Sequence, residues 1–245
     1  MSEREEEGPP SPSPSASAAA EDPSATGMWQ VPLDAFFRLQ LALPRLQPLP
    51  PLDGSLQGWP RAALLPDLSA LHGQGSFGRV LAGWTLDGLA FGVEVDVGHD
   101  LRLDPEHPFR SDGIEVWVDT RDSRDARKPT RFCHHFLLLP GGHGPRGRAC
   151  YVQEMNPGGV KRPEDMADIQ RIRAKAEVGR GGYTLEFLLP REVLAGYAPL
   201  EATSIALAYR LRSSVYGVQD LAFGEHFPLW RNPSLWLSAR LAAAG

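Results

Sequence analysis

Residues 107–120 read HPFRSDGIEVWVDT, and this stretch decides the fold that the sequence predicts. Aliphatic residues recur in it at every second position, as the run Ile114, Glu115, Val116, Trp117, Val118 and Asp119 shows. Successive side chains of a strand point to opposite faces, so this period of two predicts a strand whose aliphatic side faces a core.

Similar stretches lie on both sides of this segment. Upstream, VLAGWTLDGLAFGVEVDV (80–97) predicts a hairpin that turns at Asp87-Gly88. Downstream, four further strands are predicted, at TRFCHHFLLLP (130–140), GGYTLEFLLP (181–190), SIALAYRLR (204–212) and PSLWLSARL (233–241). Short strands separated by turns rich in Gly and Pro predict an all-β fold, an antiparallel sandwich of the immunoglobulin or jelly-roll type.

Helices have little place in this pattern. One short helix is predicted at PREVLAGY (190–197), with Pro190 near its start and Gly196 near its end, and at most one more is expected. Residues 36–43 predict a short strand or strap along the domain. Residues 141–178 fit either a long loop or one helical turn followed by a strand at 169–178.

Residues 1–27 differ in composition from the rest of the chain. They are rich in Ser, Pro, Ala and Glu, contain no aromatic residue, and carry six acids against one base. Such a segment buries too little apolar surface to offset the entropy of ordering, so a disordered tail is predicted, followed by a single domain at 28–245. That domain keeps 24 of the 30 acidic and 24 of the 25 basic residues. Its balanced charge predicts neither nucleic acid nor an anionic membrane as partner.

The sequence gives a few indications of the cellular compartment and of the redox state of the cysteines. No apolar run approaches the roughly 20 residues of a membrane-spanning helix. The N-terminus has early acids and no apolar stretch of a secretory signal, which predicts a cytoplasmic protein. A start codon further upstream would change that prediction to secretion. Cys133 and Cys150 allow at most one disulfide, and the sequence leaves their pairing open.

Catalytic and metal-binding motifs are not supported by the residue patterns. Glu115 and Asp119 share a strand face but stand about 13 Å apart, whereas glycosidase carboxylates need about 5–9.5 Å. His134 and His135 point to opposite faces of one strand and cannot easily hold one metal ion together. The glycine-rich GQGSFGRV (73–80) lacks the other kinase motifs. The sequence therefore predicts neither an enzyme nor a metal centre.

Five segments in order resemble the family 9 carbohydrate-binding module (CBM9), a member of the DOMON-like group of β-sandwiches. They are LDGSLQGWP (52–60), AGWTLDGLAFGVEVDV (82–97), HPFRSDGIEVWVDT (107–120), GGYTLEFLLP (181–190) and LWRNPSLWLSARL (229–241). The resemblance spans Leu52 to Leu241. It implies a soluble, non-catalytic module that grips a mono- or oligosaccharide end between two aromatic rings.

The resemblance also implies particular site residues. One ring of the sugar slot falls on Phe109, three residues before Asp112, and the other falls on Trp230. Glu115 matches the acid that hydrogen-bonds the sugar, and Arg210 is nearest to a polar residue that reaches the ligand from a later strand. No cofactor is implied beyond a structural calcium ion, to which no residue of this chain is assigned.

Some positions depart from the family pattern. Cys133 or His134 stands where the family tends to have arginine, and Arg212-Ser213 replaces an Asn-Asp pair. An alternative hypothesis follows from these departures. The chain would then be an intracellular protein-interaction or structural β-sandwich that has lost sugar binding.

Overall fold

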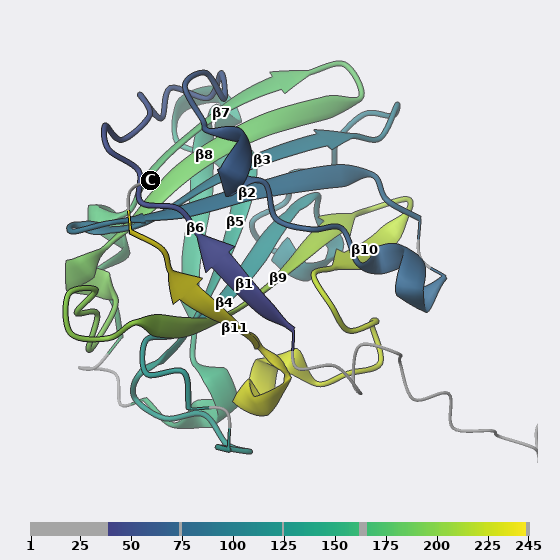
Figure 1. The fold of residues 1–245 in the computed structure, drawn as a ribbon. Helices are drawn as coiled ribbons and strands as arrows, with labels where there is room; N and C mark the ends of the chain where they lie inside the picture. Colours follow the sequence, from purple (N-terminus) through teal and green to yellow (C-terminus); the bar gives the residue numbers. More distant parts are fainter. Residues whose placement is uncertain (1–38, 74, 124, 162–165, 244–245) are drawn as a thin grey trace, which may run out of the picture. The chain divides into compact units, whose positions relative to one another are not determined.

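Two β-sheets pack face to face in this protein (Figure 1). The structure is a computed structural model that describes residues 39–243 apart from 74, 124 and 162–165. These residues form one compact unit, and the predicted tail at 1–27 lies outside the described residues. The prediction of an all-β sandwich is confirmed.

The larger sheet has seven strands in the order β1-β11-β9-β4-β5-β6, with β10 also paired to β9. Its strands are β1 (Gln40–Leu43), β4 (Gly113–Asp119), β5 (Cys133–His143), β6 (Ala149–Met155), β9 (Ser204–Ser213), β10 (Gly217–Asp220) and β11 (Leu237–Leu241). The smaller sheet has the order β2-β3-β8-β7, formed by β2 (Gly78–Thr85), β3 (Gly88–Asp96), β8 (Gly182–Pro190) and β7 (Arg173–Gly179). All pairs are antiparallel except β1 with β11.

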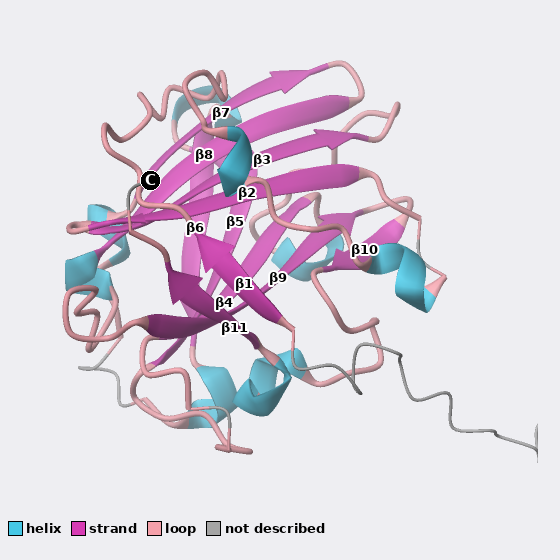
Figure 2. Cartoon of the chain, viewed as in Figure 1, coloured by secondary structure: helices cyan, strands magenta, loops and turns pink. Residues whose placement is uncertain are grey.

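Helices in the described residues are 3-10 turns (η) of three or four residues, drawn in cyan in Figure 2. They are η2 (Arg61–Ala63), η3 (Ser69–His72), η4 (Pro108–Arg110), η5 (Pro145–Gly147), η6 (Pro157–Gly159), η8 (Ile169–Arg171), η9 (Arg191–Val193), η10 (Leu229–Arg231) and η11 (Pro233–Leu235). The helix predicted at 190–197 is only η9, because Leu194 already leaves helical geometry at φ −110° and ψ 84°. No described helix has the length and apolarity that crossing a membrane requires.

The core lies between the sheets, where the period of two placed it. The side chains of Ile114, Val116 and Val118, which the period of two predicted to face the core, are exposed by 1% or less. The same holds for Leu185, Phe187 and Leu189 on β8. Phe187 stacks on Phe91 of the neighbouring strand with ring centroids 4.9 Å apart. Cross-strand aromatic pairs of this kind add to the stability that apolar burial provides.

The opposite face of β4 is also covered. Glu115, Trp117 and Asp119 are exposed by 2% or less, although each alternates with a core residue. Trp117 stacks on His135 of β5 with ring centroids 4.4 Å apart. Polar groups on this face therefore depend on partners inside the protein, and Nε1 of Trp117 has none among the described residues.

In the region 141–178 the structure agrees with one of the two interpretations of the sequence. A helical turn (η8) followed by a strand (β7) occupies its end, as one of the two interpretations held. That interpretation did not include β6. The strand β10, which follows a turn after β9, was not predicted either. The strap predicted at 36–43 contains β1.

The segment LDGSLQGWP is fastened to the smaller sheet by one buried carboxylate. Glu186 of β8 accepts hydrogen bonds from the backbone N–H of Gly54 and from Nε1 of Trp59, each at 2.6 Å. Because these donors are 132 and 127 residues away in sequence, the contact ties the start of the domain to a late strand.

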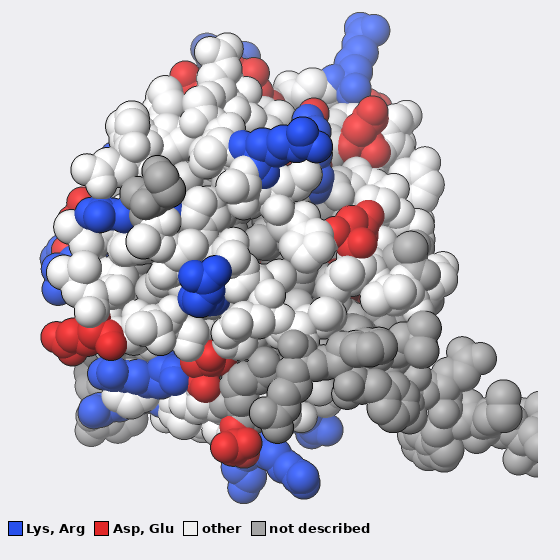
Figure 3. All heavy atoms as spheres, in the orientation of Figure 1, with Lys and Arg blue, Asp and Glu red and all other residues white. Residues whose placement is uncertain are grey.

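The described surface in Figure 3 carries Lys, Arg, Asp and Glu side chains scattered among uncharged ones. The described residues form no continuous patch of one sign on the face drawn there.

Candidate functional site

Glu115 sits at the centre of a buried ionic group on the larger sheet. Its Oε2 lies 2.7 Å from Nε2 of His135 on β5. Its Oε1 lies 2.6 Å from Nε and 2.5 Å from Nη2 of Arg212 on β9. We call Glu115, His135 and Arg212 the Glu115 network. Both carboxylate oxygens are thus bound by protein donors.

The Glu115 carboxylate is held in its ionised form. Burial raises its pKa, but the hydrogen bond and charge of His135 and the charges of Arg212 and Arg210 outweigh burial. The pKa of Glu115 therefore lies below its ordinary value. An ionised carboxylate accepts hydrogen bonds, so Nε2 of His135 is the donor in this contact.

Arg210 stands directly opposite Glu115 in the sheet, yet it binds another acid. Its Nε and Nη2 donate to the two carboxylate oxygens of Asp220 on β10, at 2.6 and 2.9 Å. Burial raises the pKa of Asp220 despite this pairing. The bidentate geometry directs the Arg210 guanidinium toward β10. Arg210 as a whole is only 9% exposed.

Phe109 lies next to the Glu115 network on η4 and is 45% exposed. The guanidinium carbon of Arg212 is 5.4 Å from its ring centroid, and Nη1 of Arg212 donates to its backbone oxygen at 3.3 Å. The loop before β4 is held by Asp112, whose Oδ2 accepts from Arg102 N at 2.7 Å and Ser214 Oγ at 2.9 Å. Phe109 is thereby linked to Glu115 through Arg212.

Trp230 is 51% exposed and lines a separate hollow of about 690 Å³. We call this space the Trp230 hollow. Three segments line it: Arg127, Lys128 and Pro129; Asn156, Gly158, Gly159 and Val160; and Pro228, Trp230, Arg231 and Asn232. The guanidinium carbon of Arg231 lies 5.2 Å from the Trp230 ring centroid.

The two predicted stacking rings belong to different ends of β4. Phe109 contacts Arg212, which pairs with Gly113, the first residue of β4. The segment 127–129 precedes Cys133, which pairs with Asp119, the last residue of β4. The structure thus brings Phe109, Glu115 and Arg210 into one neighbourhood and places Trp230 in the hollow beside the other end. Phe109 is not among the residues that line it.

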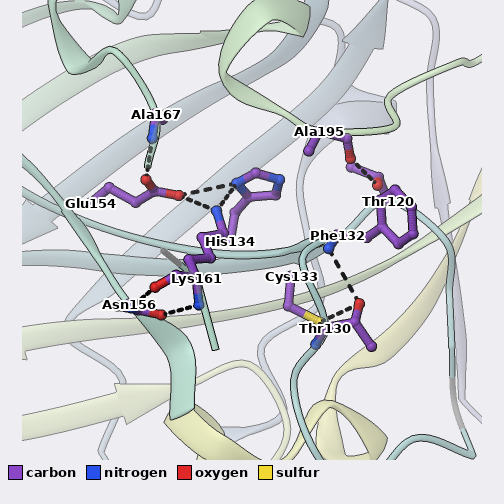
Figure 4. A network of polar contacts seen from close by, with 10 residues as sticks. All are labelled: Thr120, Thr130, Phe132, Cys133, His134, Glu154, Asn156, Lys161, Ala167 and Ala195. Carbon is purple, nitrogen blue, oxygen red and sulfur yellow. Dashed lines mark hydrogen bonds and ion pairs between the residues drawn. The ribbon is translucent and has the colours of Figure 1, made fainter. Parts of the chain in front are cut away.

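The loops of the Trp230 hollow are anchored by a buried polar network, shown in Figure 4. Nζ of Lys161 lies 2.8 Å from Nδ1 of His134 and contacts the Glu154 carboxylate. Nδ2 of Asn156 donates to the backbone oxygen of Lys161 at 2.7 Å, and Lys161 N donates back to Asn156 Oδ1 at 2.9 Å. These bonds fix the start and end of the segment 156–161.

A second group of contacts in Figure 4 lies between the segment 127–129 and the start of β5. Thr130 N donates to Sγ of Cys133 at 3.3 Å, and Phe132 N donates to Oγ1 of Thr130 at 3.2 Å. A Cβ added to Gly158 would lie 3.2 Å from the Pro129 ring, so the two loops touch. Both cysteines, Cys133 and Cys150, are free thiols.

Among the described residues, one group of side chains offers metal ligands close to one another. Asp104, Glu106 and His107 each offer a ligand atom within 4.8 Å of the others. The set does not fit the calcium ion that the family resemblance allowed, because calcium takes six to eight oxygen ligands and His107 offers nitrogen. Asp104 Oδ2 already contacts His107 Nδ1 at 3.0 Å.

Sequence reasoning missed Arg212 as the partner of Glu115 and missed the loops at 127–129 and 156–160. A weak signal for Arg212 was present, since it shares a strand face with Arg210 at a spacing of two. No signal in the sequence linked Trp230 to loops 70 or more residues away.

The two-sheet sandwich is a CBM9-like fold. A CBM9 from Caldicellulosiruptor kristjanssonii in complex with cellotriose superposes with a TM-score of 0.59 at 16% identity, covering 84% of this chain and 94% of that one. A CBM9 from Caldicellulosiruptor kristjanssonii in complex with glucose gives a TM-score of 0.58 at 16% identity, covering 85% of this chain and 97% of that one. No family model and no curated protein matches the sequence.

Proposed function

We propose that this protein is a non-catalytic carbohydrate-binding module that stacks a sugar ring on Trp230. The observation that carries the proposal is the exposure of this ring at the Trp230 hollow. Among the described tryptophans Trp230 alone is exposed, whereas Trp84, Trp117 and Trp236 are buried and Trp59 is half-buried. A volume of about 690 Å³ lies within the range of small-ligand sites.

Aromatic rings and sugars suit each other because the apolar face of a sugar ring packs against a flat π-surface. Trp230 lies on η10, and the guanidinium carbon of Arg231 lies 5.2 Å from its ring centroid. The CBM9 structures with cellotriose and glucose show that this scaffold accommodates sugars in other proteins, which supports the proposal.

The surroundings of two acidic residues on β4, Glu115 and Asp119, support the proposal that the protein is not catalytic. Glu115 has a lowered pKa and two cationic or donor partners, so it does not suit a general acid at neutral pH. Asp119 accepts backbone hydrogen bonds from Arg121 at 3.0 Å and from Ser123 at 2.8 Å. It therefore acts as a cap for the turn that follows β4.

A second candidate function is a protein-interaction or structural β-sandwich without sugar binding. The observation that favours it is the internal pairing of Glu115 and Arg210, the two polar residues that the family resemblance assigned to the sugar. In this alternative the sheet face keeps its ionic pairs for stability, and Trp230 contacts a protein.

The test is a glycan array of neutral and acidic sugars, followed by calorimetry on the hits. We expect binding that Trp230→Ala abolishes. Phe109→Ala serves as the matched aromatic control and should leave binding intact, because Phe109 does not line the Trp230 hollow. Binding to no glycan, or binding that Trp230→Ala leaves intact, would contradict the proposal.

A further inference from the structure

Among the described residues, three cationic side chains and no acidic one line the Trp230 hollow: Arg127, Lys128 and Arg231. This local excess contrasts with the balanced charge of the domain as a whole. It is strongest in the segment 121–131, which has five Arg or Lys residues and two Asp residues. Asp122, one of those two acids, hydrogen-bonds Ser238 instead of a cation of the hollow.

The cations of the hollow are not neutralised by the described part of the chain. Neither Arg127, Lys128 nor Arg231 forms an ion pair with any residue that the structure describes. Arg231 lies over the Trp230 ring. Cations gathered at a concave surface without counter-charges favour the binding of an anion there.

The side-chain amide groups of the hollow already have hydrogen-bond partners. Oδ1 and Nδ2 of Asn156 are both bound to the backbone of Lys161. Oδ1 of Asn232 accepts from Ser234 N at 3.3 Å and from Ser234 Oγ at 2.7 Å. A sugar hydroxyl accepts hydrogen bonds but also has a donor to satisfy, whereas an oxyanion only accepts, and the side chains left free here are mainly donors. A ligand that brings its own acceptors as oxyanions suits the hollow better.

The hollow is also pre-formed, which favours selective binding over a loose association of charges. Its two loops touch at Gly158 and Pro129, and the segment 156–161 is fastened to the buried polar network of Figure 4. Lys161, which anchors one loop, is itself 5% exposed and bound to Glu154. Little conformational freedom remains to be lost when a ligand binds.

We infer that the Trp230 hollow binds an acidic saccharide, with a sugar ring on Trp230 and a carboxylate or sulfate group on Arg127 and Lys128. This inference rests on the proposed function and names its ligand class. Arginine binds carboxylate and sulfate in a planar two-point geometry, and lysine adds a point charge beside it. The ring selects a sugar and the cations select its acidic group.

Calorimetry on the full chain with three trisaccharides tests the inference: neutral cellotriose, its sulfated derivative, and trigalacturonate. We expect the acidic ligands to bind at least about tenfold more tightly than cellotriose, with affinity falling as salt rises from 50 to 200 mM. Binding of only one acidic ligand would show whether sulfate or carboxylate is the recognised group.

Variants separate the hollow from general electrostatics. The double variant Arg127→Gln/Lys128→Gln should weaken binding of the acidic ligand about tenfold while leaving the melting temperature unchanged. Lys175→Gln on β7 is the matched control, since it removes an exposed cation from the smaller sheet and should change nothing. Trp230→Ala should abolish binding.

Three results would overturn the inference. Equal or tighter binding of cellotriose, with the double variant unaffected, would leave the proposed function standing and remove the acidic ligand class. Acidic ligands bound equally by the Trp230→Ala variant would mean charge attraction without a sugar site. Binding of none of the trisaccharides, together with an empty glycan array, would remove the proposed function itself.

Discussion

Arg212 binds the carboxylate of Glu115 from a diagonal position, at 2.6 Å between Nε and Oε1, although Arg210 stands directly opposite it. Arg210 instead turns to Asp220 on β10. The two arginines of β9 thus pair separately with acids of two neighbouring strands, Glu115 of β4 and Asp220 of β10. Removing one member of either pair would leave the other charge without its partner.

Glu115→Gln should lower the free energy of unfolding by about 3 kcal/mol, because Arg212 would lose its counter-charge in a buried setting. Urea unfolding at pH 7 measures the change. Glu94→Gln is the control, since Glu94 pairs with Arg79 at the surface and should cost less than about 1 kcal/mol. Equal costs for the two variants would mean that the Glu115 network adds nothing beyond a surface pair.

Val116→Asp should prevent cooperative folding, because it places a charge with no partner between the two sheets. Val116 is fully buried, whereas Val178 on β7 is 51% exposed. Val178→Asp makes the same chemical change on a strand surface and should stay within about 1 kcal/mol of the parent. Thermal melting followed by circular dichroism distinguishes them, and a cooperatively melting Val116→Asp protein would refute the assignment of its face.

Stability should fall as the pH drops below about 6.5, and His134 should account for part of that fall. Burial and the charge of Lys161 hold the pKa of His134 below its ordinary value, despite the opposing effect of Glu154. The unfolded chain therefore takes up a proton near pH 6.5 that the folded chain does not bind. The loss of stability begins at that pH and ends at the lower, folded pKa.

Urea unfolding at pH 7 and pH 5.5, with His134→Gln beside the parent, measures this contribution. The variant should show a smaller loss of stability over that interval. Glu154 also has a lowered pKa, but its contribution is lost only below about pH 4.5, outside this window. Identical losses in parent and variant would show that His134 takes up a proton equally in both states.

Trp230→Ala should leave the free energy of unfolding within about 1 kcal/mol of the parent, since the ring is half exposed. Trp236→Ala should cost about 3–5 kcal/mol, because Trp236 is fully buried and its Nε1 donates to the Leu229 oxygen. The two tryptophans lie six residues apart, so denaturant unfolding of both variants compares exposure with burial in one segment. A large cost for Trp230→Ala would indicate a structural role.

The sequence determined the strands whose one side faces the core. Residues 114–118 and 185–189 carry an apolar residue at every second position, and a slip of one residue would move these side chains out of the space between the sheets. Local pattern was therefore enough for β4 and β8, and for the hairpin at Asp87-Gly88. It was not enough for β6, whose residues are mostly half-buried at a sheet edge and so carry a weak alternation.

Only the tertiary structure decided the partners of the functional residues. Glu115 lies between two arginines on β9, and the position of Asp220 on β10 determines which of them it binds. Trp230 meets the loops at 127–129 and 156–160 because β5 and β6 lie side by side and their loops converge at one end. Periodicity describes the two faces of one strand; it carries no information about which distant loops meet, because that depends on how the strands are ordered in the sheet.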